Sequence, residues 1–367
     1  VYYTPEPVVS YMVRSVDILL KEKLDKPLGL ADPEVMILDP ACGTGTFLLY
    51  IFREIHQRFE ENPEALTEGL ADKSWSGYVK ERLLPRIFGF ELLMAPYAIA
   101  HLKLGLFLEE TKYQFDSGRR LGVFLTNTLD EAVHKSESLF EEFIAEESDQ
   151  AADIKSQMPV MIVIGNPPYS ATSANTGNWI VRLTKDSYYP KDDIKEQNPK
   201  LLLDDYVKFI RFSQWRIQET GFGIFAFINN HGYLNNSTFR RMRESLLDTF
   251  DEFSILDLHG NIKRKEKGDS KEQDGNVFDI QQGVAIGIRN RNKKEQSKED
   301  NPCITRQHDL WGSRESKYIY LENSNIKEQD WEQIDPGKPF FLLIPQDTSN
   351  LLEYQKGWKI TDAMPVN

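Results

Sequence analysis

A short apolar segment followed by a glycine loop and an amphipathic stretch constrains the fold of this chain more than any other feature. Residues 34–38 (EVMIL) predict a buried strand, and residues 39–47 (DPACGTGTF) follow it directly. Apolar side chains at helical spacing then occupy residues 48–55. A strand, a glycine loop and a helix in this order are typical of the crossover that binds a mononucleotide. Gly43 and Gly45 would let the backbone approach a ligand closely, beside the free N–H groups of the helix N-terminus.

This loop differs from the two common phosphate-binding loops. The third glycine of a dinucleotide fingerprint is absent, because Thr46 and Phe47 follow Gly45 directly. The chain also lacks the Gly-Lys-Ser/Thr sequence of a P-loop. A small charged nucleoside therefore fits this loop better than a pyrophosphate.

The alternation of apolar segments with helical patterns predicts the fold class. Seven segments indicate strands, at residues 34–38, 86–90, 121–125, 160–164, 223–228, 253–258 and 277–288. Helical patterns separate most of them, and another begins at Thr4-Pro5 and runs to about Asp25. We therefore expect an α/β fold: a doubly wound, seven-stranded, mostly parallel sheet with an N-terminal helix and a C-terminal appendage. Because the pattern weakens after Asn290, we place a boundary near residue 295.

A Pro-Pro motif follows the strand predicted at residues 160–164. Pro167 and Pro168 have no N–H groups, so their backbone can offer only carbonyl oxygens to a ligand at the strand end. Asn166 adds a side-chain acceptor and Tyr169 adds a flat ring. A planar heterocycle with an exocyclic amino group suits this set, because it can donate to both acceptors while it stacks on tyrosine. The alternative is an ordinary turn capped by asparagine, with the tyrosine packed as a core residue.

Two more polar residues follow predicted strands. Glu91 ends the second strand, where an acid commonly holds both hydroxyls of a ribose. Its alternative role is to cap the helix predicted at residues 95–108. Asn127 lies in the loop after the third strand. The carboxyl ends of the strands in an open α/β sheet are where ligands bind, so these residues belong to one expected site.

Composition limits the kinds of protein to consider. The net charge of −13 argues against a wholly basic nucleic-acid-binding surface, although basic residues gather at 240–243, 263–267 and 289–294. A solvated face is the common alternative for each of these basic segments. Two cysteines cannot form a disulfide framework, and the six histidines have no paired metal-binding spacing, so we expect no metal. No apolar run of about 18 residues occurs, which favours a soluble cytoplasmic protein with no membrane contact.

Three of these features stand in a recognisable order: Thr4-Pro5 at the start of the first helix, the glycine loop, and residues 166–169. In this order they resemble the S-adenosylmethionine-dependent N6-adenine DNA methyltransferases of restriction-modification systems. The resemblance covers about residues 1–290. It implies that the cofactor is S-adenosylmethionine, that the partner is double-stranded DNA, and that the methyl acceptor is N6 of a flipped-out adenine.

The resemblance also implies which residues surround the cofactor. They are Tyr3, Thr4, Pro5, Asp39, Ala41, Gly43, Gly45, Glu91, Asn127 and Asn166. Thr4 and its neighbours would touch the methionine end, and Glu91 would hold the ribose. The family usually has aspartate where this chain has Asn127, to bond the adenine amino group of the cofactor. An asparagine oxygen can still accept that bond.

For the target base, the resemblance implies that Asn166 and the carbonyl of Pro167 accept hydrogen bonds from the N6 amine. Pro168 completes the motif, and Tyr169 would stack on the extruded base. The segment around Phe278 resembles a later motif of the family, which makes this ring a candidate for the opposite face of the base. An ordinary apolar strand residue is the alternative for Phe278.

Two segments, residues 278–283 and 358–362, are similar to long restriction enzymes that fuse a methylase to helicase and nuclease parts. We expect residues 1–295 to form the methyltransferase catalytic domain. Residues 296–367 would form a linker and the start of a possible target-recognition or accessory region. Fused or associated nuclease, helicase and target-recognition domains are the expected partners.

Two other functions stay open from the sequence. A protein-glutamine N5 methyltransferase uses the same Asn-Pro-Pro-Tyr motif, because a glutamine amide resembles the adenine amino group. The Thr-Pro helix, the long aromatic-bearing segment after Tyr169 and the basic segments favour DNA over this alternative. A non-catalytic DNA-recognition or assembly subunit could share the fold, although every expected catalytic position is filled. Serine in place of Asn166 would have indicated methylation of cytosine N4, which ranks third.

Overall fold

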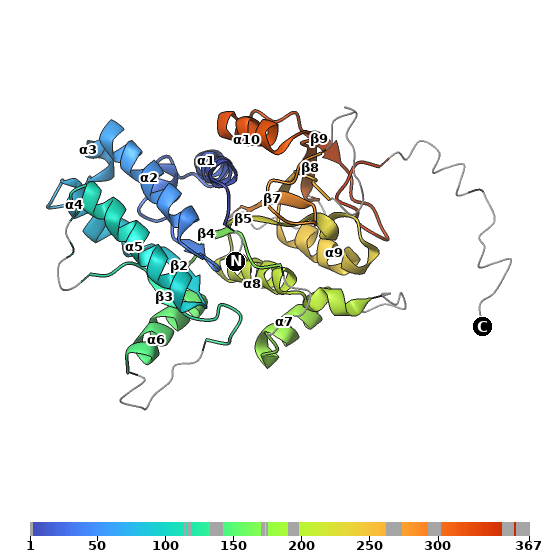
Figure 1. The fold of residues 1–367 in the computed structure, drawn as a ribbon, viewed down its shortest axis with the longest axis horizontal. Coiled ribbons are helices and arrows are strands. Elements are labelled where there is room, and N and C mark those ends of the chain that lie inside the picture. The colour runs from blue at the N-terminus through green and yellow to red at the C-terminus, as the bar shows by residue number, and fades with distance from the viewer. Residues whose placement is uncertain are drawn as a thin grey trace.

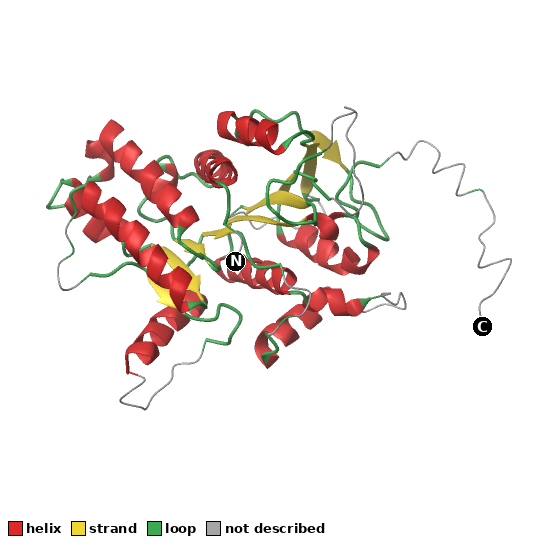
Figure 2. Ribbon diagram, viewed as in Figure 1, coloured by secondary structure: helices red, strands yellow, loops and turns green. Residues whose placement is uncertain are grey.

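The described part of the chain forms one mixed sheet with helices on both faces. The computed structural model describes residues 3–113, 115, 119–132, 142–169, 173, 175–189, 198–261, 274–292, 302–346 and 356. Within these residues, nine strands pair in the order β3-β2-β1-β4-β5-β7-β6-β8-β9. Figure 1 shows helices on the two sides of this sheet, and Figure 2 shows the same view by secondary structure.

The strands are β1 (Ile37–Asp39), β2 (Ile87–Glu91), β3 (Val123–Leu125), β4 (Ile162–Gly165), β5 (Gly223–Asn230), β6 (Glu252–Asp257), β7 (Val284–Arg291), β8 (Ile304–Asp309) and β9 (Glu332–Ile334). The α-helices are α1 (Glu6–Lys23), α2 (Thr46–Glu61), α3 (Pro63–Leu66), α4 (Trp75–Tyr78), α5 (Met94–Glu110), α6 (Glu142–Ser156), α7 (Asn178–Tyr188), α8 (Asp205–Thr220), α9 (Arg240–Thr249) and α10 (Arg314–Asn323). Shorter helical turns are η1 (Gly29–Ala31), η2 (Val79–Leu83), η3 (Pro199–Leu203), η4 (His231–Leu234) and η5 (Ser237–Phe239).

The expected α/β class and the mostly parallel sheet are confirmed, but the expected number of strands is wrong. Each of the seven segments predicted as strands overlaps one of β1 to β7. The described sheet has nine strands because β8 and β9 extend it beyond β6. The sequence of β8, ITRQHD, is largely polar, and β9 has only three residues. The last predicted strand also begins later than expected, at Val284.

The direction of the strands decides where a site can form. β1 to β5 run parallel to one another, β7 runs antiparallel between β5 and β6, and β8 is parallel to β6. The carboxyl ends of β1 to β6 and β8 therefore meet at one edge. The loops that follow these strands share that edge, as in other open α/β sheets.

Alternating side chains of the strands supply two hydrophobic cores, one on each face of the sheet. On β5, Ile224, Ala226 and Ile228 belong to the core shared with α1 and α2. Phe225 and Phe227 point the other way, into the core shared with α8 and α9. The central strands are covered on both faces, which explains their nearly continuous apolar sequences.

The segment after residue 295 is attached to the rest of the chain by the sheet and by two arginines. Arg14 of α1 donates to the carbonyl oxygens of Leu321, Glu322 and Ser324, at distances of 2.7 to 3.0 Å. Arg243 of α9 donates to the carbonyl of Phe340 at 2.7 Å. The expected boundary near residue 295 falls between β7 and β8, which both pair with β6. The division into domains stays a prediction.

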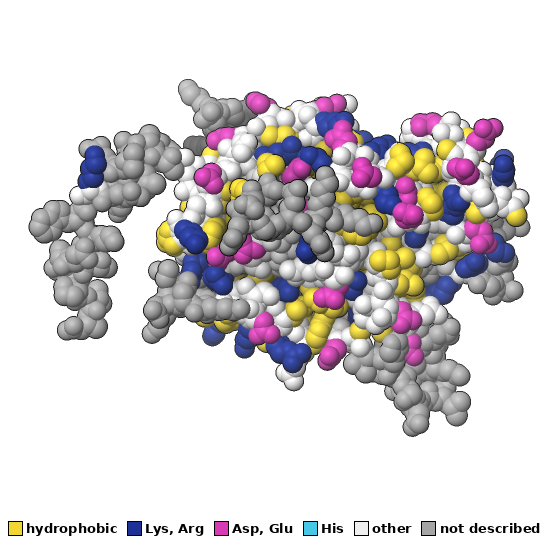
Figure 3. All heavy atoms as spheres, turned by 180° about the vertical axis from the view of Figure 1, so that it is seen from behind, with side chains coloured by type: hydrophobic (Ala, Val, Ile, Leu, Met, Phe, Trp, Pro, Cys, Tyr) yellow, Lys and Arg dark blue, Asp and Glu magenta, His cyan; other side chains and the backbone are white. Residues whose placement is uncertain are grey.

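Three arginines of the basic segments that favoured DNA in the sequence are buried. Arg243 and Arg289 are fully buried, and Arg240 is 3% exposed. Residues 263–267, 293 and 294 lie outside the described residues. On the face shown in Figure 3, basic, acidic and apolar side chains are interspersed. These arginines serve the core, so they cannot be counted as support for DNA binding.

No helix among the described residues combines the length and the apolar character needed to span a membrane.

Candidate functional site

A cavity of about 710 Å³ opens at the carboxyl edge of β1 to β4. Its walls come from the start of the chain, the glycine loop, the segments after β2, β3 and β4, and the first turns of α8. The lining residues are Tyr3, Thr4, Pro40, Ala41, Cys42, Gly43, Thr44, Thr46, Phe47, Phe90, Glu91, Leu92, Leu93, Ala95, Pro96, Ile99, Thr126, Asn127, Thr128, Asn166, Pro167, Pro168, Tyr169, Asn175, Asp205 and Phe209. The volume is in the range of small-molecule sites, about 300–1,000 Å³.

The glycine loop has the conformation that its residues predict. Gly43 and Gly45 both have positive φ, 54° and 75°, which other residues rarely adopt. A Cβ at Gly43 would meet no atom within 4 Å, so the backbone there borders open space. At Gly45 a Cβ would lie 3.1 Å from the Cβ of Ala100, because α5 packs closely behind the loop. Gly43 thus borders the cavity, and Gly45 permits the close packing of α5 behind the loop.

Glu91 joins the loop to the start of α5. Its Oε2 accepts a hydrogen bond from the N–H of Gly43 at 3.0 Å, and its Oε1 accepts one from Leu93 at 2.7 Å. Both predicted roles are therefore compatible with its position. The carboxylate caps the segment before α5, and each oxygen keeps a lone pair that could accept a ligand hydroxyl.

Asp39 lies beneath the loop and does not line the cavity. It is 1% exposed, its Oδ1 accepts the N–H of Ala41 at 3.1 Å, and Oδ2 has no hydrogen-bond partner among the described residues. Burial, with a smaller contribution from Glu91, raises the pKa of Asp39 to about 8. With this pKa the carboxyl group is mostly protonated and neutral at pH 7, and a positive charge above the loop would favour its ionised form.

The loop after β3 carries Asn127 into the cavity. Its Oδ1 accepts the N–H of Leu129 at 3.1 Å, and its Nδ2 donates to Oδ1 of Asn175 at 2.9 Å. Asn175 in turn donates to Asp205 of α8 at 3.0 Å. The side chain of Asn127 is therefore held by two segments, and its oxygen keeps one lone pair for a ligand.

The residues after β4 form the most constrained part of the site. Asn166 donates from Nδ2 to Oγ1 of Thr4 at 3.1 Å, and its Oδ1 accepts the hydroxyl of Tyr169 at 2.7 Å. The same hydroxyl lies 3.1 Å from the carbonyl oxygen of Ile228 on β5. Burial raises the pKa of the Tyr169 hydroxyl, which therefore stays protonated at neutral pH. Thr4, from the start of the chain, and Tyr169, from the Pro-Pro motif, thus both bond to the side-chain amide of Asn166.

The structure does not bring every predicted residue to the cavity. Pro5 and Gly45 lie next to lining residues without lining the cavity themselves. Phe278 is 4% exposed within a hydrophobic core, and its N–H and carbonyl are held by Asn276 and Arg314. In this arrangement its ring cannot cover a base in the cavity.

Other lining residues carried no prediction. Asp205 and Phe209 belong to the first turns of α8, about 40 residues after the motif that they approach. No local pattern marks them, because only the packing of α8 beside β4 and β5 brings them to the edge. Leu92 and Leu93 form an exposed apolar rim of the cavity, 57% and 49% exposed. Their apolar character directly after Glu91 could have indicated this rim.

Comparison with known proteins adds family information to this geometry. Residues 1–250 match the family model described as N-6 DNA methylase. No curated protein sequence matches the chain.

Several solved structures share the fold. One is a nuclease-deletion mutant of the Type ISP restriction-modification enzyme LlaGI, in complex with a DNA substrate mimic. It is 24% identical to this chain with a TM-score of 0.78, and the match covers 96% of this chain and 28% of the LlaGI chain. The ATP-dependent Type ISP restriction-modification enzyme LlaBIII bound to DNA is 24% identical with a TM-score of 0.79. The match covers 96% of this chain and 23% of the LlaBIII chain. The chain of a DrdV–DNA complex is 26% identical with a TM-score of 0.71. The match covers 92% of this chain and 30% of the DrdV chain.

This chain therefore spans less than a third of each of these solved chains. The family model, in contrast, covers 250 of its 367 residues, and it accounts for the glycine loop and for the residues after β4. The chain belongs to the N-6 DNA methylase family.

Proposed function

We propose that this chain transfers a methyl group from S-adenosylmethionine to N6 of a flipped-out adenine in double-stranded DNA. Family membership supports the reaction class. The observation that carries the proposal is the position of Asn166, whose amide is fixed by Thr4 and Tyr169 at a cavity that also contains the glycine loop. In this proposal, Asn166 and the Pro167 carbonyl accept hydrogen bonds from the amino group, and the neighbouring loop would hold the charged nucleoside.

The residues that would hold the cofactor are those of the loop, the start of the chain and two strand ends. Glu91 would accept hydrogen bonds from the ribose hydroxyls, and Asn127 would accept one from the adenine amino group of the cofactor. Tyr3, Thr4 and the loop would surround the methionine end. When bound, the cofactor supplies an electrophilic methyl group on a sulfonium sulfur.

The acceptors at the motif explain how a weak nucleophile could react. The lone pair of adenine N6 is conjugated into the ring and so is poorly nucleophilic. Asn166 Oδ1 and the Pro167 carbonyl, aimed at the two N6 hydrogens, favour a geometry in which the lone pair leaves that conjugation. No strong base is required, because the amine loses its proton after transfer. Orientation of this kind can contribute about 7–11 kcal/mol in favourable systems.

Tyr169 would have two functions in this scheme. Its ring would stack on the extruded base, worth roughly 1–3 kcal/mol against an unstacking cost of a few kcal/mol. Its hydroxyl has two acceptors within reach, Asn166 Oδ1 at 2.7 Å and the Ile228 carbonyl at 3.1 Å. A turn of the hydroxyl toward Ile228 would release Asn166 Oδ1 for the incoming amine.

The neighbours suggest the biological setting. LlaGI and LlaBIII are both Type ISP restriction-modification enzymes; LlaGI was solved as a nuclease-deletion mutant with a DNA substrate mimic, and the ATP-dependent LlaBIII was solved bound to DNA. We propose that this chain methylates DNA within a restriction-modification system of the cytoplasm, together with fused or associated nuclease, helicase and target-recognition domains.

The test is transfer of labelled methyl from S-adenosylmethionine to duplex DNA, followed by digestion to nucleosides. RNA and a glutamine-bearing protein form parallel arms, and Asn166→Ala is the negative control. Label in N6-methyladenine from the DNA arm supports the proposal. Label only in protein overturns it in favour of a glutamine methyltransferase, and cofactor binding without transfer in any arm indicates a non-catalytic subunit.

A further inference from the structure

A second cavity lies further along the same edge of the sheet. Its volume is about 290 Å³, and its lining includes His231, Asp257, His259 and Asp309. These residues follow or end β5, β6 and β8, which are outside the cavity described above. We propose that this cavity binds one divalent transition-metal ion, with His231, Asp257 and His259 as its ligands and Asp309 as the residue that orients His259.

The geometry of His259 supports this proposal first. Its Nε2 lies 2.7 Å from Oδ1 of Asp309, and that carboxylate also accepts a hydrogen bond from Gln307 at 2.6 Å. A carboxylate only accepts, so Nε2 carries the proton, and the Nδ1 of a neutral ring keeps its lone pair. Nδ1 lies 3.8 Å from Oδ1 of Asp257. Two acceptors at this separation can share a cation that is about 2.0–2.2 Å from each.

His231 brings a third ligand to the same point. Its Nδ1 lies 3.1 and 3.3 Å from the two oxygens of Asp257, where it can donate a hydrogen bond. A metal ion between these atoms would take the place of that proton, which is released on binding. One ligand atom from each of His231, Asp257 and His259 lies within 4.8 Å of the other two. The ring packs directly against Gly283, where a Cβ would lie only 2.3 Å from its Cε1. Glycine at position 283 therefore permits the close approach that holds the imidazole toward the cavity.

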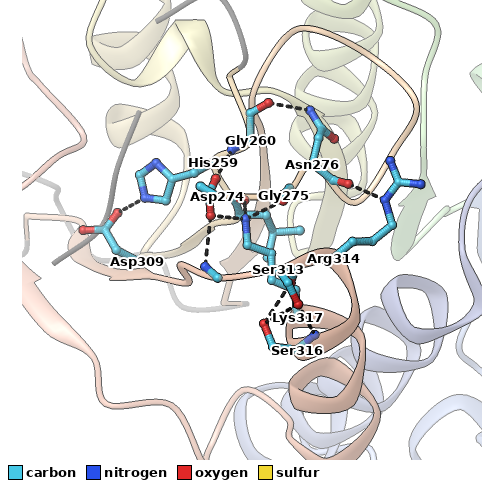
Figure 4. A network of polar contacts seen from close by, with 12 residues as sticks. His259, Gly260, Asp274, Gly275, Asn276, Asp309, Ser313, Arg314, Ser316 and Lys317 are labelled. Carbon is cyan, nitrogen blue, oxygen red and sulfur yellow. Dashed lines mark hydrogen bonds and ion pairs between the residues drawn. The ribbon is translucent and has the colours of Figure 1, made fainter. Parts of the chain in front are cut away.

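The backbone at His259 is strained and is held in place by its surroundings. His259 has φ of +49°, although it is not glycine. Lys317 donates to the carbonyl of Leu258 at 2.7 Å, and Asp274 accepts the N–H of Gly260 at 2.7 Å. Figure 4 shows this network around His259, including the buried ion pair between Asp274 and Lys317 at 2.6 Å. Strain that is fixed from several sides is typical of ligand-binding positions.

The imidazole ring of His259 is also fixed, by a stacking contact on one face. Its ring stacks on Trp311 at 3.4 Å between centroids, with 12° between the planes. A histidine ring that is stacked on one face, and bonded through its second nitrogen to a carboxylate, has the usual arrangement of a metal ligand. The position of Asp309 supplies this orienting bond.

The ligand set indicates the class of metal. Two imidazole nitrogens and one carboxylate, without a thiolate, suit Zn²⁺, Mn²⁺ and similar ions better than Mg²⁺, which prefers oxygen. The cavity leaves room for water in a further coordination position. Histidine spacing in the sequence predicted no metal, because the two histidines follow different strands and meet only through the order of the sheet.

The experiment measures metal binding by the whole chain without cofactor or DNA, so its result does not depend on methyl transfer. The chain is stripped with a chelator and titrated with Zn²⁺ in a calorimeter, with Mg²⁺ as the control ion. We expect one Zn²⁺ per chain and a higher Tm with Zn²⁺. Asp257→Asn and His259→Asn should weaken binding at least 100-fold, and asparagine also tolerates the positive φ of residue 259. Asp309→Asn should weaken binding about 10–100-fold.

His308→Asn is the matched control, because His308 bonds the carbonyl of Asp330 outside the cavity. It should bind Zn²⁺ like the unmodified chain. Absence of stoichiometric Zn²⁺ binding would overturn the proposal, as would equal binding by all variants. If either ligand variant fails to fold, Zn²⁺ binding by Asp309→Asn tests the proposal instead. This variant should fold, since the Asp309 side chain is 36% exposed and asparagine is nearly isosteric with it.

Discussion

The two cavities on the carboxyl edge of the sheet differ in how their residues are arranged along the chain. The larger cavity is formed mainly by contiguous motifs, the glycine loop and residues 166–169, each directly after one strand. The smaller one combines single side chains from the ends of β5, β6 and β8. A contiguous motif can be found in the sequence. A site formed by strand order can be found only once the sheet is known.

Replacing Asn166 by alanine should produce the largest effect and should distinguish the functions proposed for the two cavities. We expect methyl transfer to fall by about 10²–10³-fold, as for removal of one essential polar group in an active site. S-adenosylmethionine binding and Zn²⁺ binding should hardly change. Labelled transfer and calorimetry measure these effects, with Asn323→Ala, at an exposed position of α10, as the control. Unchanged turnover would show that the motif does not hold the reacting amine.

Tyr169→Ala should have the next largest effect, and the effect should depend on the substrate. Loss of stacking worth roughly 1–3 kcal/mol corresponds to about 5–150-fold weaker binding or turnover on duplex DNA. A substrate with an unpaired target adenine should lose less, because less extrusion energy must be offset. Turnover of both substrates by Tyr169→Ala and Tyr169→Phe gives the comparison. Equal losses on the two substrates would argue against stacking.

Thr4→Val tests the contact between the start of the chain and the motif. Valine is similar in shape but cannot accept the hydrogen bond from Asn166 Nδ2, which is worth about 0.5–1.5 kcal/mol. We expect the rate of transfer to fall by about 2–12-fold. The KM for DNA should change little. A loss confined to KM would contradict a role in orienting Asn166.

Asp39 should give a pH-dependent effect on stability. Its folded pKa is about 8, above the usual value, so its contribution to stability is present at low pH and is lost as pH rises from about 4 to about 8. Asp39→Asn lacks this titration. Its free energy of unfolding relative to the unmodified chain should therefore be greater at pH 8 than at pH 5, by at least ~1.4 kcal/mol. Urea unfolding at both pH values measures this difference, with the exposed Asp248→Asn as the control. A difference that is constant with pH would contradict the raised pKa.

The sequence predicted the parts of the structure that depend on local pattern. The strands from β1 to β6 lie within or next to the predicted segments, because their buried residues form continuous apolar runs. Tyr3, Thr4, Ala41, Gly43, Glu91, Asn127 and the four residues 166–169 all line the larger cavity. Whether each of them acts as proposed stays a prediction.

Features that depend on tertiary packing could not be predicted in this way. β8 has a largely polar sequence because its side chains lie near the margin of the sheet. Phe278 is buried because the segment before β7 folds back into the core, held by Asn276 and Arg314. Arg289 resembled a surface charge in the sequence, yet its guanidinium lies 3.9 Å from the ring centre of Phe253. In each case the sequence identifies the residue type, and the packing partner decides its environment.

The position of β7 has a consequence for the synthesis of the chain. β7 lies between β5 and β6, although it is made after both of them. Until residue 291 has left the ribosome, β5 has an unpaired edge and β6 has no neighbour in the sheet. An apolar strand with an unpaired edge tends to associate with other chains. The nascent protein therefore passes through a state prone to aggregation, which ends when β7 pairs with both β5 and β6.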